Sequence, residues 1–136
     1  MCGDKNTNHL IFHHLNPEEK EKLVSQFYIL EKIEKEFSKC EILCANCHDK
    51  VHYGSSKYKI ASKAQQFARD YKHDAGCSVC GEKTECCLQY HHINSDEKYK
   101  GISKIYNMEE MKIEMSKCIV LCNNCHKDYH KVGVVI

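Results

Sequence analysis

Cysteines and histidines occur in this chain at the spacings that proteins use to bind metal ions. There are 11 cysteines and 10 histidines among 136 residues. Cys77 and Cys80 form one Cys-x-x-Cys pair, and Cys122 and Cys125 form another. Two such pairs supply four thiolates, which is the ligand set of a tetrahedral structural zinc site. The sequence therefore predicts a closed structural Zn²⁺ site made by these four cysteines.

Histidines beside the second cysteine pair suit a separate ion. His126 and His130 are four residues apart, so on a helix they share one face. A third ligand can come from His91, and three imidazoles leave coordination positions open for water and substrate, as catalytic metal sites do. His92 alternates to the opposite side of its strand. A neutral imidazole there is suited to accept a proton from water.

The same arrangement occurs earlier in the chain. After a shift of 78 residues, about 23 of the 51 positions from Cys2 to His52 are identical, with no gap. The first copy repeats one cysteine pair and all four histidines: Cys44, Cys47, His13, His14, His48 and His52. A duplication of this kind predicts two related units, each too small for a full core and each stabilised by zinc.

The zinc site of the first copy is expected to be incomplete. The counterpart of Cys77 would fall before the first residue, so the expected ligands are Cys2, Cys44 and Cys47. The fourth ligand is left open among His9, Cys40, the amino group of the chain, Cys86 and Cys87. We therefore expect the first unit to be the less stable one.

Short strands and helices are expected to position these cysteines and histidines. Apolar runs before each histidine pair and each cysteine pair predict strands at 10–12, 42–43, 88–90 and 119–121, and each His-x₃-His sequence predicts a short helix. In the first copy, Asn16 and Pro17 are typical of a helix start, and apolar residues at helical spacing predict that this helix continues to Phe37. In the second copy we expect a helix from Asn107 to Met115, with its methionines in the core.

A connecting segment separates the two copies. Gly54-Ser55-Ser56 predicts a hinge, and an apolar stripe predicts an amphipathic helix, formed by Ile60, Ala64, Phe67 and Tyr71. The opposite face is rich in lysine and arginine. It is either a solvated face on a helix that docks against the second copy, or a surface that follows phosphates. The expected domains are residues 1–54, 55–76 and 77–136.

At these residues the chain resembles the HNH endonucleases that carry a zinc knuckle. The matching sequences are CSVCG, LQYHHI, KYKGIS and SKCIVLCNNCHKDYH in the second copy, and CG, IFHHL and SKCEILCANCHDKVH in the first. The resemblance implies a small, zinc-stabilised α+β protein with two tandem ββα-metal units joined by a helix. It also implies hydrolysis of DNA phosphodiesters that depends on a divalent ion.

The resemblance also implies a role for each residue. His92 and His14 correspond to the general base that activates water. The ligands of the catalytic ion, Mg²⁺ or another divalent cation, would be His91, His126 and His130 in the second copy and His13, His48 and His52 in the first. The structural Zn²⁺ ligands would be Cys77, Cys80, Cys122 and Cys125, with Cys2, Cys44 and Cys47 in the first copy.

The chain departs from the family at one position of the site. Lys39 and Lys117 stand where the family has an asparagine that helps to orient the site. Two alternatives to a nuclease are therefore retained. One is a non-catalytic zinc protein that binds nucleic acid, and the other is a structural part of a larger assembly. DNA is the expected partner, and an intrachain pseudo-dimer would place one site on each strand.

Composition limits the remaining possibilities. A net charge of +1 gives no overall basic field, so phosphates would have to be met by local patches. The sequence has no apolar run of about 18 residues, the length that a membrane span needs, and no signal peptide is visible. We therefore expect a reducing compartment, cytoplasmic or host intracellular, in which the cysteines bind metal instead of forming disulfides.

Overall fold

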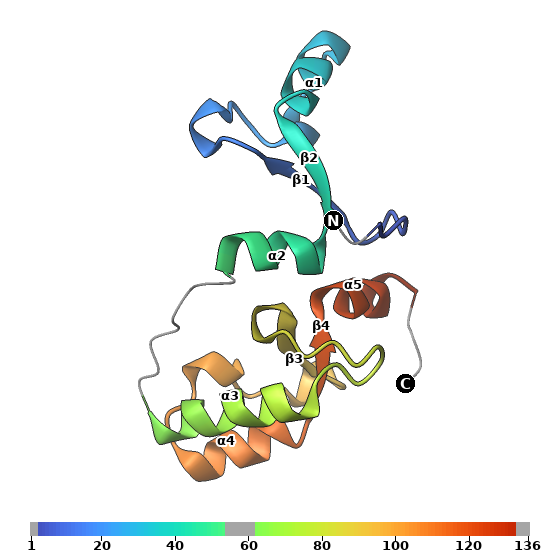
Figure 1. Cartoon of the computed structure of the whole chain (residues 1–136). Helices are drawn as coiled ribbons and strands as arrows, with labels where there is room; N and C mark the ends of the chain where they lie inside the picture. The colour runs from blue at the N-terminus through green and yellow to red at the C-terminus, as the bar shows by residue number, and fades with distance from the viewer. Residues whose placement is uncertain (1–2, 54–61, 133–136) are drawn as a thin grey trace.

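The computed structural model describes residues 3–53 and 62–132 (Figure 1). The predicted hinge at 54–56, Ile60 and the expected zinc ligand Cys2 lie outside the described residues. No helix within those two ranges has the length and apolar character needed to cross a membrane.

The first unit contains a β-hairpin followed by a helix. Strand β1 (Leu10–His14) pairs antiparallel with β2 (Cys40–Cys44), in a register that places Leu10 opposite Cys44 and His14 opposite Cys40. Helix α1 (Leu30–Phe37) lies between the two strands in the chain, and α2 (Ala45–Tyr53) follows β2 without a break. The predicted strands and the helix through His48 and His52 are therefore confirmed.

The second unit repeats this order after an additional helix. Helix α3 (Lys63–Ala75) precedes β3 (Leu88–His92), α4 (Met108–Met115), β4 (Cys118–Cys122) and α5 (Asn123–Val132). Strands β3 and β4 pair antiparallel, with Leu88 opposite Cys122 and His92 opposite Cys118. Residues 78 apart thus occupy equivalent positions in the two hairpins. The protein is a small α+β protein with two two-stranded antiparallel sheets, as the sequence predicts.

The long helix predicted from Pro17 to Phe37 is wrong. This segment forms two 3₁₀ turns, Pro17–Glu19 and Val24–Gln26, before α1 begins. The buried carboxylate of Glu36 accepts the backbone N–H of Glu21, and the Lys39 ammonium donates to the backbone carbonyl of Glu19. These tertiary contacts use backbone groups that a continuous helix would pair internally, so they hold the segment as a loop.

The second unit has the same loop with 3₁₀ turns at Ser95–Glu97 and Ile102–Lys104, and its α4 agrees with the prediction. The Asn107 side chain caps α4 by accepting the backbone N–H groups of Glu109 and Glu110. Met111 and Met115 are buried, and Met108 packs against the same cluster.

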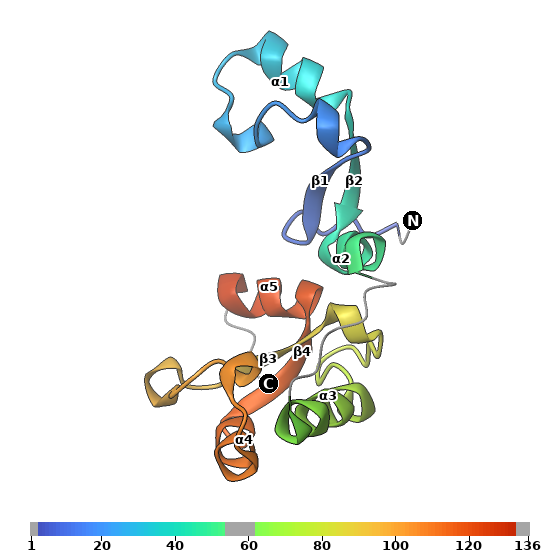
Figure 2. The ribbon, with the colours of Figure 1, turned by 90° about the vertical axis from the view of Figure 1, so that its left-hand side faces the viewer.

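Helix α3 docks against the second unit, which was one of the two interpretations of its sequence. Figures 1 and 2 both show α3 beside α4. Its buried residues are Ala64 and Ala68, whereas Phe67 and Tyr71 are exposed. The predicted apolar stripe is therefore wrong in part. Small alanines allow the helix backbone to approach α4 and β3 closely, so the contact face is the one with the smallest side chains.

The two units meet where α2 and α5 begin (Figure 1). The backbone N–H of Asn46 donates to the Asn124 side-chain oxygen at 3.1 Å, and the N–H of Asn124 donates to the Asn46 side-chain oxygen at 3.3 Å. Because these residues are 78 positions apart, equivalent residues bond each other reciprocally. Such a contact is typical of two units related by a twofold axis.

Candidate metal centres

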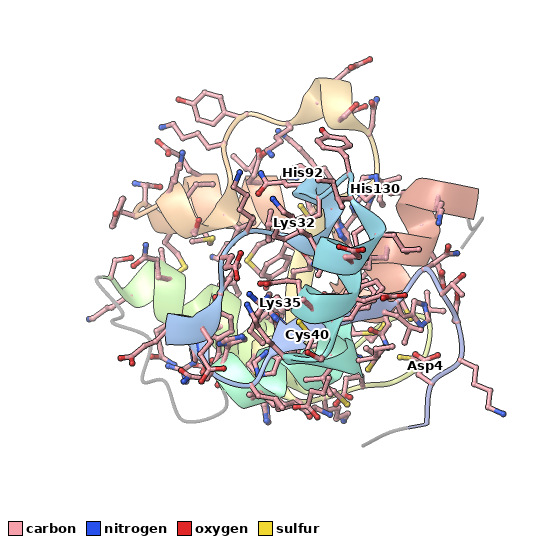
Figure 3. All side chains as sticks on the ribbon, turned by 90° about the horizontal axis from the view of Figure 1, so that it is seen from above. Asp4, Lys32, Lys35, Cys40, His92 and His130 are labelled. Atoms are coloured by element: carbon pink, nitrogen blue, oxygen red, sulfur yellow. The ribbon has the colours of Figure 1, made fainter. Side chains whose placement is uncertain are left out.

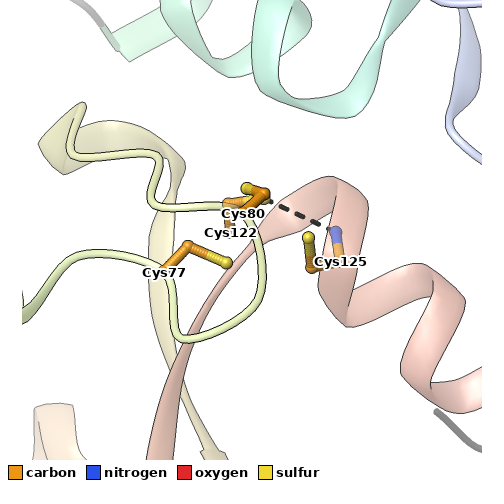
Figure 4. Close-up of side chains that lie close together, drawn as sticks. All are labelled: Cys77, Cys80, Cys122 and Cys125. Carbon is orange, nitrogen blue, oxygen red and sulfur yellow. Dashed lines mark hydrogen bonds between the residues drawn. The ribbon is translucent and has the colours of Figure 1, made fainter. Parts of the chain in front are cut away.

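Four cysteines of the second unit come together where β4 passes into α5 (Figure 4). Cys122 ends β4, Cys125 lies in the first turn of α5, and the 77–80 turn brings Cys77 and Cys80 to them. The four sulfur atoms all lie within 4.8 Å of one another. The turn is closed by a hydrogen bond from the Gly81 N–H to the Cys77 carbonyl at 2.9 Å, with Gly81 at a φ of 75°. This group could hold a structural metal such as zinc.

The local electrostatics also fit a metal at these cysteines. Burial raises the pKa of the Cys77 thiol, but backbone hydrogen bonds at Cys80, Cys122 and Val79 outweigh it and bring the pKa down to about 7. Burial is the main cause that raises the pKa of Cys80 and of Cys125. A cation would compensate the charge of four adjacent thiolates, which makes metal binding the natural use of this cluster.

A histidine cluster lies in the second unit as the spacing predicts. His91 comes from β3, and His126 and His130 come from α5. Their ring centroids are 4.8, 4.9 and 4.5 Å apart, and their possible ligand nitrogens lie within 4.8 Å of one another. Tyr129 packs on the His91 ring at 4.2 Å and covers one side of the cluster.

The first unit has the same cluster. His13 comes from β1, and His48 and His52 come from α2. Their ring centroids are 5.3, 4.9 and 4.5 Å apart, and they form a second group with ligand nitrogens within 4.8 Å. All six histidines predicted as ligands thus fall into two matching groups of three.

Three of these histidines, His126, His91 and His48, favour the neutral form that binds metal. Burial, followed by the charges of His130 and His91, lowers the pKa of His126 to about 4. Burial is also the first cause of the lowered pKa of His91 and of His48. A neutral imidazole has a free lone pair on one nitrogen, so the clusters are chemically prepared to hold a cation.

His92 points away from the histidine cluster, as strand alternation predicts, and contacts Glu114 of α4. The His92 Nε2 and a Glu114 carboxylate oxygen are 2.8 Å apart. Burial raises the pKa of Glu114, but hydrogen bonds from Lys117, His92 and the backbone of residues 99–100 outweigh it and hold the pKa at about 2. The carboxylate is therefore ionised, so Nε2 carries the hydrogen and the other ring nitrogen, Nδ1, is left with the lone pair of a neutral ring.

Lys117, which stands at the position of the expected asparagine, completes this network. Its ammonium lies 2.8 Å from the second Glu114 oxygen and 3.0 Å from the backbone carbonyl of Glu97. The first unit repeats the network: His14 lies 2.7 Å from Glu36, and Lys39 lies 2.8 Å from the same carboxylate. The two glutamates were not identified from the sequence. Their identity across the 78-residue shift, three positions before a lysine, was the available signal.

His92 also lines a cavity of about 490 Å³ between α3 and β3. Three cationic side chains line the same cavity: Arg69, Lys72 and Lys98. Glu85 is the acidic residue in this lining and pairs with Arg69 at 2.8 Å. The lining of this cavity thus has more cationic than acidic side chains, although the chain as a whole is almost neutral.

The first unit has no described cluster that matches the four cysteines. Cys44 and Cys47 occupy the positions of Cys122 and Cys125. Cys40 does not fit as a further ligand, because it lies at the opposite end of β2 from Cys44, four residues of extended chain away.

Two more of the candidates for that ligand have other partners. His9 lies between Asp4 and Asp128, at 2.7 and 2.8 Å. The Cys87 thiol donates to the backbone carbonyl of Asn46 at 3.4 Å.

Comparison of the chain with protein-family models, with curated proteins and with solved structures found no match. The fold and the clusters define a class: a small α+β protein whose described residues include one cysteine group and two histidine groups that could bind metal.

Proposed function

We propose that this chain is a metal-dependent endonuclease of the HNH type, with two ββα-metal units that hydrolyse DNA phosphodiesters. The observation that carries the proposal is the repeated site. In each unit three histidines from a hairpin and the following helix converge, and the next histidine in the strand is held by a buried glutamate. Both copies have kept this arrangement although more than half of the compared positions differ, which is difficult to explain by packing alone.

The histidine clusters and the cysteine group would bind different ions. His91, His126 and His130 would hold the catalytic divalent ion in the second unit, and His13, His48 and His52 in the first. Such an ion, when bound, stabilises negative charge on the phosphate and on the leaving oxygen. Cys77, Cys80, Cys122 and Cys125 would hold a structural Zn²⁺ that fixes the start of α5.

His92 and His14 would act as general bases. With Nε2–H donated to Glu114, the Nδ1 lone pair of His92 is the one that can take a proton from water. The ionised carboxylate stabilises the imidazolium that forms when the proton arrives. Glu36 would serve His14 in the same way.

DNA is the proposed substrate because the cations beside His92 supply a local site for phosphate. Lys72 is partly buried, and burial is the first cause of its lowered pKa, so an anion nearby would stabilise its charge. Lys98 lies in the lining of the same cavity. Local patches of this kind can bind phosphates even when the net charge of a protein is close to zero.

A second candidate is a non-catalytic zinc protein that binds nucleic acid or serves in a larger assembly. The observation that favours it is the direction of His92, whose side chain faces Glu114 and α4 while His91 faces the histidine cluster. In that case the glutamate and lysine would serve only to hold the strands to the helix that lies between them in the chain, α4 or α1.

Plasmid nicking in Mg²⁺, Mn²⁺ or Ni²⁺ tests the proposal. The full chain should nick supercoiled DNA, and His14→Ala with His92→Ala should lower the rate by about 10²–10⁴-fold, the usual contribution of a general base. His73→Ala, at an exposed histidine of α3, should cut like the parent.

Circular dichroism and zinc content must be unchanged in the double variant. A second double variant, His48→Ala with His126→Ala, keeps both histidine–glutamate pairs and should also lose cleavage. Parent-level cleavage by the first double variant would contradict the assignment of the base. An inactive parent that still shifts DNA in a gel would favour the second candidate.

A further inference from the structure

In the second unit, one apolar face is covered by α3. Ile105, Met111 and Met115 form a buried cluster with Ala64 and Ala68 of that helix, and Tyr90, Ile102 and Met108 pack around it. Met111 is 0% exposed and Met115 is 9% exposed. In the second unit, the apolar face of the hairpin and α4 is therefore covered by a further helix, α3.

The equivalent face of the first unit is also apolar. The residues 78 positions earlier are Phe12, Val24, Phe27, Leu30, Ile33 and Phe37, which we call the first-unit apolar face. Phe12 and Phe37 stack with their ring centroids 4.7 Å apart, so apolar side chains from β1 and α1 contact each other on this face. The duplicated fold has kept apolar side chains at all six positions.

No described helix covers this face. Phe37 is 40% exposed where its counterpart Met115 is 9% exposed, and Phe12 and Leu30 are 44% and 68% exposed. Figures 1 and 2 show no other α-helix of the described chain beside α1. Lys32 and Lys35 lie on the same helix (Figure 3), so α1 has charged as well as apolar side chains. Assembled apolar faces of this kind mark interaction sites.

We propose that the first-unit apolar face binds an amphipathic helix of a partner protein, in the position that α3 occupies on the second unit. The argument rests on the internal repeat. Two hairpins of the same register and two equivalent helices present the same kind of surface, and where the occupant is visible it is a helix. The proposal does not depend on the nuclease function.

The contacts of α3 define the chemistry of the partner helix. Ala64 and Ala68 show that small residues four positions apart are needed for close approach. Gln65 donates to the backbone carbonyl of Ser103 at 2.9 Å, and Lys72 donates to that of Leu88 at 2.8 Å.

The equivalent carbonyls in the first unit belong to Ser25 and Leu10. A matching helix therefore has small residues at positions i and i+4, an amide side chain at i+1 and a lysine at i+8.

A second copy of this chain is a poorer occupant. If α3 of another molecule moved onto the first unit, it would expose the equivalent face of its own second unit. The total apolar surface that is buried would then not increase. A symmetric pairing of two first units would bury both faces without a helix. Sedimentation of the purified chain distinguishes this pairing from the proposal.

The experiment uses α3 itself as the probe. A fluorescein-labelled peptide of residues 62–76 would be made helical by Gln66→Lys and a lactam to Asp70, two residues that already bond on the outer surface of α3. Added to the full chain, it should bind saturably in fluorescence anisotropy. The same peptide with Ala64→Glu and Ala68→Glu should not bind.

Variants of the full chain identify the surface to which the peptide binds. Leu30→Ser and Phe37→Ser should each weaken binding by about tenfold or more, because each removes a large apolar side chain from the contact with the peptide. Leu30 is so exposed that its replacement should leave the fold intact. Ile113→Ser, at a residue of α4 that is 60% exposed, is the matched control and should bind like the parent.

Two results would overturn the proposal. One is a folded, monomeric chain that does not bind the helical peptide. The other is a chain that sediments as a dimer and becomes monomeric on Phe37→Ser, because the occupant of the face would then be a second copy.

Discussion

Glu114 and Glu36 each connect several elements of their unit through one buried carboxylate. Each carboxylate is almost fully buried, and each binds a histidine of the strand and a lysine that precedes the next strand. From the intervening loop, Glu114 also accepts the backbone N–H groups of Tyr99 and Lys100, and Glu36 accepts that of Glu21. One side chain thus connects the hairpin, the helix and the loop, which explains why the loop does not continue as helix.

Replacing Glu114 tests this role. Glu114→Ala should lower the free energy of unfolding of the second unit by about 3 kcal/mol, because it leaves a lysine and a histidine that are partly buried without their anion. Glu110→Ala, at an exposed residue of the same helix, should change it by less than about 0.5 kcal/mol. Urea unfolding followed by circular dichroism measures both values. Equal, small effects would show that the carboxylate is not needed for folding.

The same contact sets the tautomer of His92. Because the ionised Glu114 accepts a hydrogen bond from Nε2, we expect the neutral ring to carry its hydrogen on Nε2. Long-range ¹H–¹⁵N spectra of the full chain report this directly, without any measurement of activity. A ring with its hydrogen on Nδ1 would contradict the proposed base, since the lone pair would then face the carboxylate.

At the scale of elements, the N-terminal segment of the first unit is attached to α5 of the second. Both ring nitrogens of His9 face carboxylate oxygens, those of Asp4 and Asp128. A ring with two carboxylate partners must donate from both nitrogens, so the arrangement favours the charged form. Burial opposes that charge, but the two hydrogen bonds outweigh it and the pKa of His9 is raised.

This contact should depend on pH. A histidine whose pKa is raised by folding stabilises the protein fully below its unfolded pKa of about 6.5, and this stabilisation is lost as the pH rises through the folded pKa. The pKa values of Asp4 and Asp128 are lowered, so their contribution is lost only as the pH falls below about 4.

We therefore expect His9→Gln to be more destabilising at pH 5.5 than at pH 8.5, as measured by urea unfolding. His73→Gln on the exposed surface of α3 should show no such difference. A loss that is equal at both pH values would contradict a charged His9.

At the scale of the whole molecule, the duplication is not symmetric. The second unit has four cysteines in one group and α3 on its apolar face, whereas the described part of the first unit has neither. The reciprocal bonds of Asn46 and Asn124 join the two units. We therefore expect the second unit to stabilise the first across this contact.

Zinc content tests this asymmetry. We expect one tightly held Zn²⁺ per chain, lost on Cys122→Ser, because only the second unit is expected to supply four thiolates. Elemental analysis after dialysis against a weak chelator measures it. Cys118→Ser, at a cysteine outside the group, should keep the ion. Two tightly held ions per chain would contradict a weakened first site.

Much of the site was predictable because its signals are local. Cys-x-x-Cys pairs, a His-x₃-His spacing on a helix and a strand before each histidine pair depend on periodicities of a few residues. A shift of 78 residues then located the second copy of each. The clustering of His91 with His126 and His130 required only that the hairpin and helix pack together.

Other features depend on contacts between distant residues, and no local pattern encodes them. The segment after Pro17 has helical periodicity, yet it forms 3₁₀ turns because Glu36 and Lys39 capture its backbone. Lys117 differs from an expected asparagine, and only the folded chain shows that it neutralises Glu114. Helix α3 buries alanines instead of Phe67 and Tyr71 because close approach to α4 leaves no room for larger side chains. Spacing along the chain thus predicted which cysteines and histidines could bind metal. Only the packing of the folded chain showed that His92 and His14 are held by the buried glutamates.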